Sequence, residues 1–443
     1  MTLPRFRNTI LLWIIGLYLL FNYGFMLVRI PPAGTKGIPI GEVVLLFTLL
    51  TIHYPSVLHR LSDRIFLLPF LVWWLLGFTR AFAGIPAHGM WALRDATHVI
   101  ESLFILAGFV FSKETEMLDH FFEWLPKLLL FGCIYSLGSP FAANLQSFSP
   151  KITGGTGQSI AIFFFYTNTS ILLLMAVVYL LLFKQKKGVN DKIIYLLSVI
   201  ILGVTVFVFQ ARTIYLQVIA IYFLLLFFRK ELIGKNIYAM FLLFLFLMIL
   251  PVIGLQIHGR IGQKISLEFI LNHLLAIGGV RAEGVEQSAY GVFQRLDWWL
   301  LLFKQWTSGA GNFLFGLGYG FPLVDFHGLT APVREPHNSY ISIIARIGLV
   351  GFVAWSWMHF LLLRAWHRTY KECTRLSWKE GENKLLIVLV FFVLIWVFAI
   401  GEDAFEKPFN AIPYYFFWGI VLRFSLHLKE EKIGPQKNGA VFR

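Results

Sequence analysis

The stretch LLIVLVFFVLIWVFAI, residues 385–400, consists entirely of Leu, Ile, Val, Phe, Trp and Ala. A helix crosses the hydrocarbon core of a bilayer, about 30 Å thick, with roughly 20 apolar residues, and about 17–25 are tolerated. Runs that meet or approach this length predict twelve membrane-spanning helices, at residues 9–29, 39–53, 65–79, 95–112, 121–138, 162–183, 193–210, 213–228, 236–254, 339–363, 385–400 and 412–427. The sequence therefore predicts an all-α polytopic membrane protein.

The composition of the whole chain supports this fold class. Hydrophobic residues make up 58% of the 443 residues and charged residues only 14%, whereas soluble domains have roughly 45–50% apolar and about 25% charged residues. An ordinary soluble enzyme and a disordered chain are both excluded. Cys133 lies in a predicted span and Cys373 in a basic loop assigned to the opposite face, and no CxxC or Cys/His ligand spacing is present. A disulfide, a zinc site and an iron–sulfur site are therefore not expected.

The distribution of basic residues predicts the orientation. With the N-terminus in the cytoplasm, more than half of the 38 Lys and Arg residues fall in inside loops, as the positive-inside rule requires. Both termini are then cytoplasmic. The chain divides into spans one to nine (1–254), a large loop on the outer side (255–338), and spans ten to twelve with a cytoplasmic tail (339–443). Within the loop, Phe269–Leu275 and Trp298–Trp306 predict short amphipathic helices along the membrane surface.

Several arginines stand where the positive-inside rule does not favour them. Arg212 opens a hydrophobic span, Arg295 and Arg334 lie in the large loop, and Arg346 lies a few residues into the tenth span. An arginine in a membrane segment costs several kcal/mol unless it is paired or hydrated. Its planar fork of donors matches phosphate oxygens, so these residues predict an outward-facing site for an anionic lipid, in particular a diphosphate. Snorkelling to the lipid headgroups is the alternative for arginines of the loop.

The segment Arg334-Glu335-Pro336-His337-Asn338-Ser339-Tyr340 marks the return of the loop to the membrane. Pro336 prevents an earlier helix start, and Asn338 or Ser339 is expected to cap the helix that follows. His337 is then expected at the water–lipid boundary, where an imidazole with an ordinary pKa near 6.5 suits proton transfer. A structural histidine is the alternative.

Two glycine patterns have simpler interpretations. Residues 316–320 read GxGxG rather than GxGxxG, without a strand–helix unit around them, and predict a flexible turn and no nucleotide site. Gly348 and Gly351 predict close helix packing in the tenth span.

At these residues the chain resembles the O-antigen ligase (WaaL) family. His337-Asn338, nine residues and then Gly348-Leu349-Val350-Gly351 resemble its H-[NSQ]-x9-G-x-x-G pattern, and Arg212 to Leu216 resemble its R-x3-L element. The predicted twelve spans and the large loop before the histidine are also similar, so the resemblance covers nearly the whole chain. It implies a GT-C-type glycosyltransferase of the bacterial inner membrane, with the large loop at 255–338 in the periplasm. Such an enzyme transfers O-antigen from undecaprenyl diphosphate to lipid A–core in lipopolysaccharide biosynthesis.

The resemblance also implies roles for residues. His337 would take or orient the proton of the acceptor hydroxyl, and Arg212 and Arg295 would bind the diphosphate of the donor. Inversion is expected for a single displacement. No cofactor is needed, because the donor carries its own leaving group, and no DxD-like cluster is obvious, so a metal-free mechanism is favoured. Glu335, Asp297 and Glu402 keep metal assistance open. Four neighbours are supporting candidates: Asn338, Arg346, Arg334 and Tyr340.

The sequence leaves other functions open. A Wzy-type polymerase would use the same donor with a second lipid-linked glycan as acceptor, and a protein O-oligosaccharyltransferase shares parts of the pattern. A lipid-linked oligosaccharide flippase is the alternative that is no enzyme, although transporters usually place polar residues near the midplane and have related halves. The expected partners are undecaprenyl-diphosphate-linked O-antigen, lipid A–core and membrane lipids, and no nucleic acid.

The orientation predicts the behaviour of reporter fusions. A reporter fused after Lys379 should report cytoplasm and one fused after Glu283 should report periplasm, because the basic loops stay inside. Alkaline phosphatase activity and green fluorescence of paired fusions measure this. A reversed pair would overturn the orientation.

Overall fold

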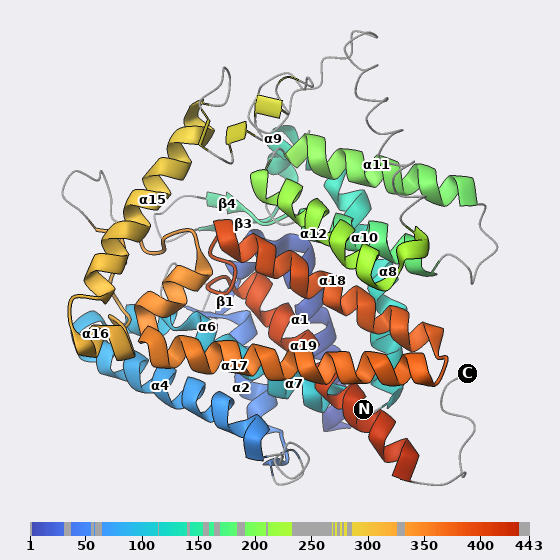
Figure 1. The fold of residues 1–443 in the computed structure, drawn as a ribbon, viewed down its shortest axis with the longest axis horizontal. Coiled ribbons are helices and arrows are strands. Elements are labelled where there is room, and N and C mark those ends of the chain that lie inside the picture. The colour runs from blue at the N-terminus through green and yellow to red at the C-terminus, as the bar shows by residue number, and fades with distance from the viewer. Residues whose placement is uncertain are drawn as a thin grey trace.

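The apolar runs of the sequence form helices (Figure 1). The computed structural model describes residues 2–30, 37–54, 57, 64–113, 115–139, 142–153, 159–163, 169–183, 191–209, 211–232, 268, 271–272, 275–276, 279–280, 286–325 and 333–433. The longer helices are α1 (Leu3–Met26), α2 (Ile40–Leu50), α4 (Arg64–His88), α7 (Phe104–Phe111), α8 (Thr115–Ser136), α10 (Thr169–Phe183), α11 (Asp191–Phe209), α12 (Arg212–Phe228), α15 (Glu286–Trp306), α17 (Ser339–Arg375), α18 (Lys379–Gly401) and α19 (Pro408–Ile433). The short helices are α5 (Met90–Asp95), α6 (Thr97–Ile100), α9 (Ala142–Leu145), α16 (Ala310–Phe315), η2 (Glu101–Leu103), η4 (Gln146–Phe148) and η6 (Lys230–Leu232). Two antiparallel hairpins pair β1 (Arg29–Ile30) with β2 (Ile38–Pro39) and β3 (Lys151–Thr153) with β4 (Ser159–Ala161).

The structure confirms a predominantly helical chain with helices suited to a membrane. Among the described residues, four helices are long and apolar enough to cross one: Leu3–Met26, Leu67–His88, Ser339–Arg375 and Lys379–Gly401. Shorter apolar helices at Ile40–Leu50, Thr97–Phe111, Thr169–Phe183 and Arg212–Phe228 overlap further predicted spans, as do α8, α11 and α19. The ninth predicted span, 236–254, lies outside the described residues, so the count of twelve stays a prediction.

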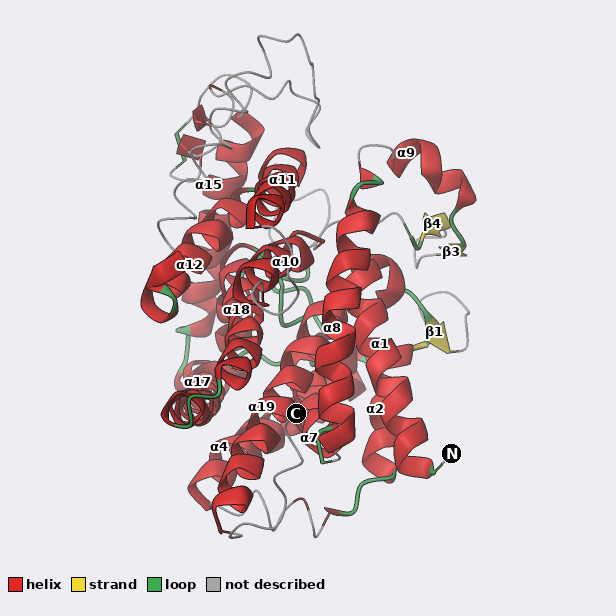
Figure 2. Cartoon of the chain, turned by 90° about the vertical axis from the view of Figure 1, so that its right-hand side faces the viewer, coloured by secondary structure: helices red, strands yellow, loops and turns green. Residues whose placement is uncertain are grey.

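The helices surround a central pair, α7 and α19. Figure 2 shows this pair between the group α1, α2 and α8 and the group α12, α17 and α18. Two glycines allow the backbones of the pair to meet: a Cβ on Gly108 would lie 2.0 Å from the carbonyl oxygen of Phe416, and one on Gly419 would lie 2.2 Å from that of Ile105. Small residues at such contacts are typical of helix packing in membranes, where van der Waals contact drives association.

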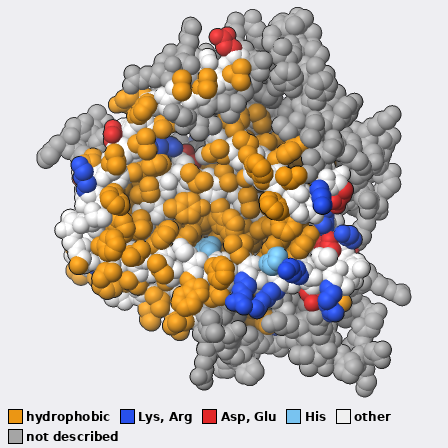
Figure 3. Space-filling model, in the orientation of Figure 1, with side chains coloured by type: hydrophobic (Ala, Val, Ile, Leu, Met, Phe, Trp, Pro, Cys, Tyr) orange, Lys and Arg blue, Asp and Glu red, His pale blue; other side chains and the backbone are white. Residues whose placement is uncertain are grey.

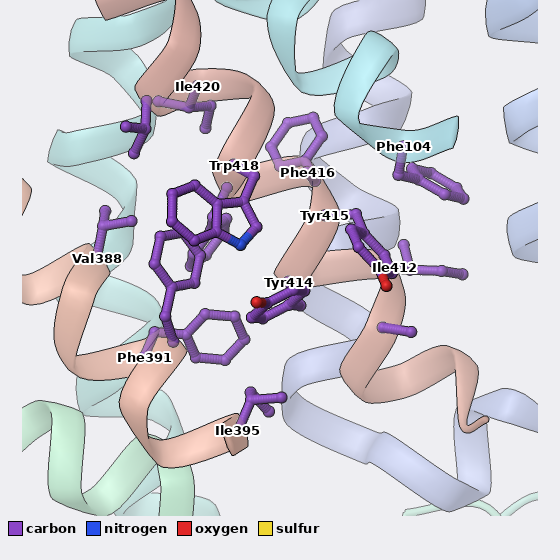
Figure 4. Packing of buried hydrophobic residues seen from close by; sticks show 14 of the residues in the cluster. Phe104, Val388, Phe391, Ile395, Ile412, Tyr414, Tyr415, Phe416, Trp418 and Ile420 are labelled. Atoms are coloured by element: carbon purple, nitrogen blue, oxygen red, sulfur yellow. The ribbon is translucent and has the colours of Figure 1, made fainter. Parts of the chain in front are cut away.

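Aromatic residues fill the space between α18 and α19 (Figure 4). The rings of Phe392 and Trp418 stack with their centroids 4.0 Å apart, and Phe391 packs against Phe417 at 4.8 Å. Tyr414 is fully buried, and its hydroxyl accepts a hydrogen bond from the indole nitrogen of Trp396 at 2.6 Å. This packing fixes the end of α18, from which the candidate site is built.

The part of the large loop that the structure describes packs against α17. The amphipathic helix predicted at Trp298–Trp306 is confirmed, because it forms the second half of α15 and buries Trp298, Leu302 and Trp306 on one face. The helix predicted at Phe269–Leu275 lies mostly outside the described residues. The turn at 316–320 is held to α17 by hydrogen bonds from the Leu317 and Gly318 amides to the carbonyls of residues 345 and 346, at 2.7 and 2.9 Å.

Gly348 explains how this turn reaches α17. It has φ 67° within the helix, a left-handed conformation that favours glycine. A Cβ there would lie 2.4 Å from the amide nitrogen of Gly316 and 2.5 Å from the carbonyl oxygen of Leu314. The predicted close packing is therefore confirmed for Gly348, and its partner is α16 with the turn that follows.

One face of the molecule is largely hydrophobic, with charges near its ends (Figure 3). Lys and Arg side chains gather toward the right of this view, where α17 ends. The exposed basic residues of this helix are Arg364, Arg368, Lys371 and Arg375. An apolar band with a basic end is what a helical membrane protein presents to lipid.

Gly348→Ala should destabilise the fold. The left-handed backbone alone costs about 1–3 kcal/mol for a residue with a Cβ, and the contact with Gly316 adds to this. Thermal unfolding of the detergent-solubilised protein measures it. Gly311→Ala in α16 is the matched control, because a Cβ there meets nothing within 4 Å; equal melting temperatures for the two variants would contradict the prediction.

Candidate active site

The sequence-predicted residues Arg212, Arg295 and His337 are brought to one end of the bundle, around the last residue of α18. Arg212 begins α12, Arg295 lies in α15, and His337 precedes α17. A Cβ on Gly401 would lie 3.0 Å from Thr213 Cγ2 and 3.8 Å from Arg295 Nη1. Arg295 Nη1 donates to the Gly401 carbonyl at 2.7 Å, and Arg212 Nη1 donates to the Ala276 carbonyl at 3.2 Å. We call these three residues, together with Glu402 and Asp403, the His337 site.

Two consecutive tryptophans of α15 hold the turn that carries His337. The indole of Trp298 stacks on the imidazole with ring centroids 6.1 Å apart and an angle of 27°. Trp299 Nε1 donates to the carbonyl of Pro336 at 2.9 Å. His337 itself has φ 52°, a left-handed conformation that costs on the order of 1–3 kcal/mol and is often found at functional sites. The contacts from α15 therefore stabilise a conformation that the chain would not adopt alone.

Two carboxylates face one edge of the imidazole. His337 Nδ1 lies 3.4 Å from Glu402 Oε2 and 3.5 Å from Asp403 Oδ2. Glu402 Oε1 lies 3.5 Å from Arg295 Nη2, so the Glu402 carboxylate bridges the histidine and the arginine. The side chain of His337 is 36% exposed. Because Nδ1 faces the carboxylates, Nε2 at the opposite edge of the ring is the nitrogen left for a substrate.

The charges set the protonation of the site. Contact with the Glu402 carboxylate raises the pKa of His337; burial opposes this, and the charge of Asp403 adds to it. Burial acts to raise the pKa of Glu402, but the contacts with His337 and Arg295 outweigh it and lower that pKa. Burial raises the pKa of Asp403 to about 6. The arrangement therefore stabilises the imidazolium that forms when His337 takes up a proton beside an ionised Glu402.

A second set of charged side chains, which we call the Arg346 network, consists of Arg346, Arg334, Glu335 and Asp95. Arg346 has no exposed side-chain surface, and its Nη2 lies 3.1 Å from Glu335 Oε1 and 3.3 Å from Asp95 Oδ2. Arg334 contacts Asp95 through both Nε and Nη2, at 3.1 and 2.6 Å. Glu335 also accepts from the Ser342 hydroxyl at 2.6 Å. Arg346 and Arg334 are predicted to support substrate binding, and that role stays a prediction. The structure places Arg346 in the interior, where it fastens the loop to α5 and α17.

Asn338 and Tyr340 join the start of α17 to the end of α18. The Asn338 side chain accepts from the amide of Ile341 at 3.1 Å, which confirms the predicted helix cap, and its Nδ2 donates to the Ile400 carbonyl at 2.9 Å. Tyr340 donates to the Trp396 carbonyl at 3.0 Å. Both residues position His337 relative to Glu402 through the backbone.

The sequence did not identify Asp403 and Trp298 as site residues, and it suggested Glu402 only as a possible metal ligand. A signal for the carboxylates was present, since Glu402 and Asp403 come one residue after the most apolar run, at the end that the predicted orientation places on the side of His337. Among the described residues, no group of three or more His, Cys, Asp or Glu side chains is placed to hold a metal ion.

Comparison of the chain with protein-family models and with curated proteins finds no match. The resemblance to O-antigen ligases therefore rests on the two short motifs and on the predicted spans. The geometry around His337 is a separate observation, because residues from four distant segments meet there.

Glu402→Gln should lower the pKa of His337, since the substitution removes the largest cause of its elevation. Diethyl pyrocarbonate modifies neutral imidazole, so the pH at which the His337 peptide reacts half-maximally reports this pKa. We expect a midpoint above 6.5 in the unmodified chain and a lower one in the variant. Glu231→Gln is the control, because Glu231 pairs with Arg229 and not with the histidine. Equal midpoints for all three proteins would remove Glu402 from the electrostatics of the site.

Proposed function

We propose that this protein is a membrane glycosyltransferase of the inner membrane that transfers O-antigen polysaccharide from undecaprenyl diphosphate to a sugar hydroxyl of lipid A–core. The observation that carries the proposal is the convergence of Arg212, Arg295 and His337, the residues of the family resemblance, around Gly401. Two guanidiniums and an imidazole backed by carboxylates form the set that a diphosphate leaving group and an acceptor hydroxyl require.

The reaction is a single displacement. The acceptor oxygen forms a bond to the anomeric carbon while the bond from that carbon to the diphosphate breaks, and undecaprenyl diphosphate leaves with the electron pair. The acceptor proton moves to Nε2 of His337. Glu402 and Asp403 then stabilise the imidazolium that forms, from 3.4 and 3.5 Å. Attack from the face opposite the leaving group inverts the anomeric configuration.

The arginines bind and stabilise the diphosphate leaving group. Arg295 uses two of its donors within the protein, on Gly401 and Glu402, and a guanidinium has five. Its side chain is 26% exposed, so donors remain for phosphate oxygens. Charge that develops on the diphosphate is neutralised by fixed guanidiniums, the kind of electrostatic stabilisation that often contributes most to catalysis. The proposed mechanism therefore needs no metal ion and no cofactor.

The proposed topology has twelve spans, cytoplasmic termini and a periplasmic loop at 255–338 that carries Arg295 and leads into His337. The apolar helices support it, as does the basic end of α17 opposite the site. A site at the ends of α12 and α18 suits a substrate whose lipid tail lies in the bilayer and whose reacting group lies at its surface.

The test is ligation by purified protein, with undecaprenyl-diphosphate glycan as donor, in the presence of EDTA. Lipid A–core is the acceptor in one arm, and a second lipid-linked glycan is the acceptor in the other. Glycosylated lipid A–core supports the ligase, elongated lipid-linked glycan supports a polymerase, and the absence of product from both would contradict the proposal.

Substitutions separate the roles. His337→Ala should lower turnover by roughly 10²–10⁴ with donor binding nearly unchanged, because general acid–base catalysis contributes that much. Arg295→Ala should weaken donor binding and lower turnover. Arg295→Lys should restore little of either, since lysine lacks the planar fork of N–H donors. Initial rates and donor titrations measure both effects, with the exposed Lys304→Ala as control. Full activity of His337→Ala would remove the histidine from the mechanism.

A further inference from the structure

A second cluster of arginines lies outside the His337 site, around Trp91. The guanidinium carbon of Arg94 lies 4.4 Å from the centroid of the Trp91 ring, and that of Arg334 lies 4.1 Å from it. Trp91 is 41% exposed, and Arg94 is exposed as well. We call Arg94, Trp91 and Arg334 the Trp91 patch.

The patch carries more positive than negative charge. Asp95, the neighbouring carboxylate, is already bound by Arg334 at 2.6 Å and by Arg346 at 3.3 Å, and its Oδ2 also accepts from the Gly320 amide at 2.9 Å. Desolvation lowers the pKa of Arg94, and repulsion from Arg29 and Arg334 lowers it further, against the weaker attraction of Asp95. An anion bound here would relieve this repulsion.

The geometry favours a phosphate as that anion. The face of the indole attracts both guanidiniums, at 4.4 and 4.1 Å from its centroid, and this contact uses none of their N–H groups as hydrogen-bond donors to a carboxylate or phosphate. The N–H fork of a guanidinium matches two phosphate oxygens. Arg334 is fixed by its two bonds to Asp95, whereas Arg94 is at the exposed edge of the patch and is the residue from which we expect the main contact.

The patch lies close to the candidate active site along the backbone. Arg334 precedes His337 by three residues, a stretch that spans at most about 11 Å. The donor diphosphate is already assigned to Arg212 and Arg295, which come from α12 and α15, whereas Trp91 and Arg94 come from α5. A single glycolipid headgroup is large enough to reach both the patch and Nε2 of His337.

We infer that the Trp91 patch binds a phosphate group on the acceptor glycolipid and so places its sugar hydroxyl at His337. The inference rests on the proposed function for the identity of the acceptor. It assigns Arg94 to acceptor recognition and leaves the donor to the His337 site.

The test compares a phosphorylated acceptor with the same acceptor after phosphatase treatment. For Arg94→Ala, we expect the acceptor KM to rise about 10-fold or more with the phosphorylated form, which corresponds to loss of a hydrogen bond to a charged group. The donor KM and kcat should not change, and with the dephosphorylated acceptor the variant should match the unmodified chain. Lys304→Ala removes one exposed positive charge from α15 and should move none of these values.

Equal weakening of both acceptors by Arg94→Ala, an equal effect of Lys304→Ala, or no effect of Arg94→Ala on either acceptor would overturn the inference. The last outcome is expected if Arg94 merely contacts bulk lipid headgroups. Direct binding of the two acceptors to His337→Ala protein, with and without Arg94→Ala, keeps this result independent of turnover. If the unmodified chain forms no ligation product, binding that depends on both Arg94 and the phosphate would sustain the patch and reject the proposed function.

Discussion

The guanidinium of Arg346 has no contact with solvent, and the end of the bundle that carries the candidate site is organised around it. Taking a charge of this size out of water costs several kcal/mol, which only close partners offset. Arg346 has two carboxylates, Asp95 and Glu335, and the backbone carbonyls of residues 318, 321 and 334. These partners come from three segments, so satisfying one buried charge fixes the positions of α5, the glycine turn and the turn before α17 at once.

This arrangement explains why a reactive residue can stand on an irregular segment. His337 has a backbone conformation that is unfavourable for a residue with a Cβ, yet it lies between Glu335, which Arg346 holds, and Asn338, which caps α17 and binds the end of α18. The stacking of Trp298 adds support from the third side. Sites built on rigid elements and backed by such contacts keep their geometry.

The sequence predicted features that are local in origin. Apolar run length predicted helices, Pro336 and Asn338 predicted where α17 begins, and Gly348 predicted a close contact. The motif residues Arg212, Arg295 and His337 were singled out by charge, position and resemblance. Local signals of this kind do not predict contacts between distant segments. Nothing in the residues around Arg346 indicates that Asp95 is its partner, so its place in the interior could not be predicted. Asp403 and Trp298 were not identified as site residues because their contacts with His337 also join distant segments.

The end of α18 has an electrical consequence. The last carbonyls of a helix carry about half a negative charge, and those of residues 400 and 401 receive Asn338 and Arg295 directly. Helix α18 is thus an oriented dipole whose negative pole lies at the His337 site. This negative pole attracts cations to the site before any substrate binds. It helps to hold the guanidinium of Arg295 close to the imidazole of His337 despite their mutual repulsion. Since each residue advances a helix by about 1.5 Å, the length of this 23-residue helix sets how far that pole lies from the opposite end of the helix.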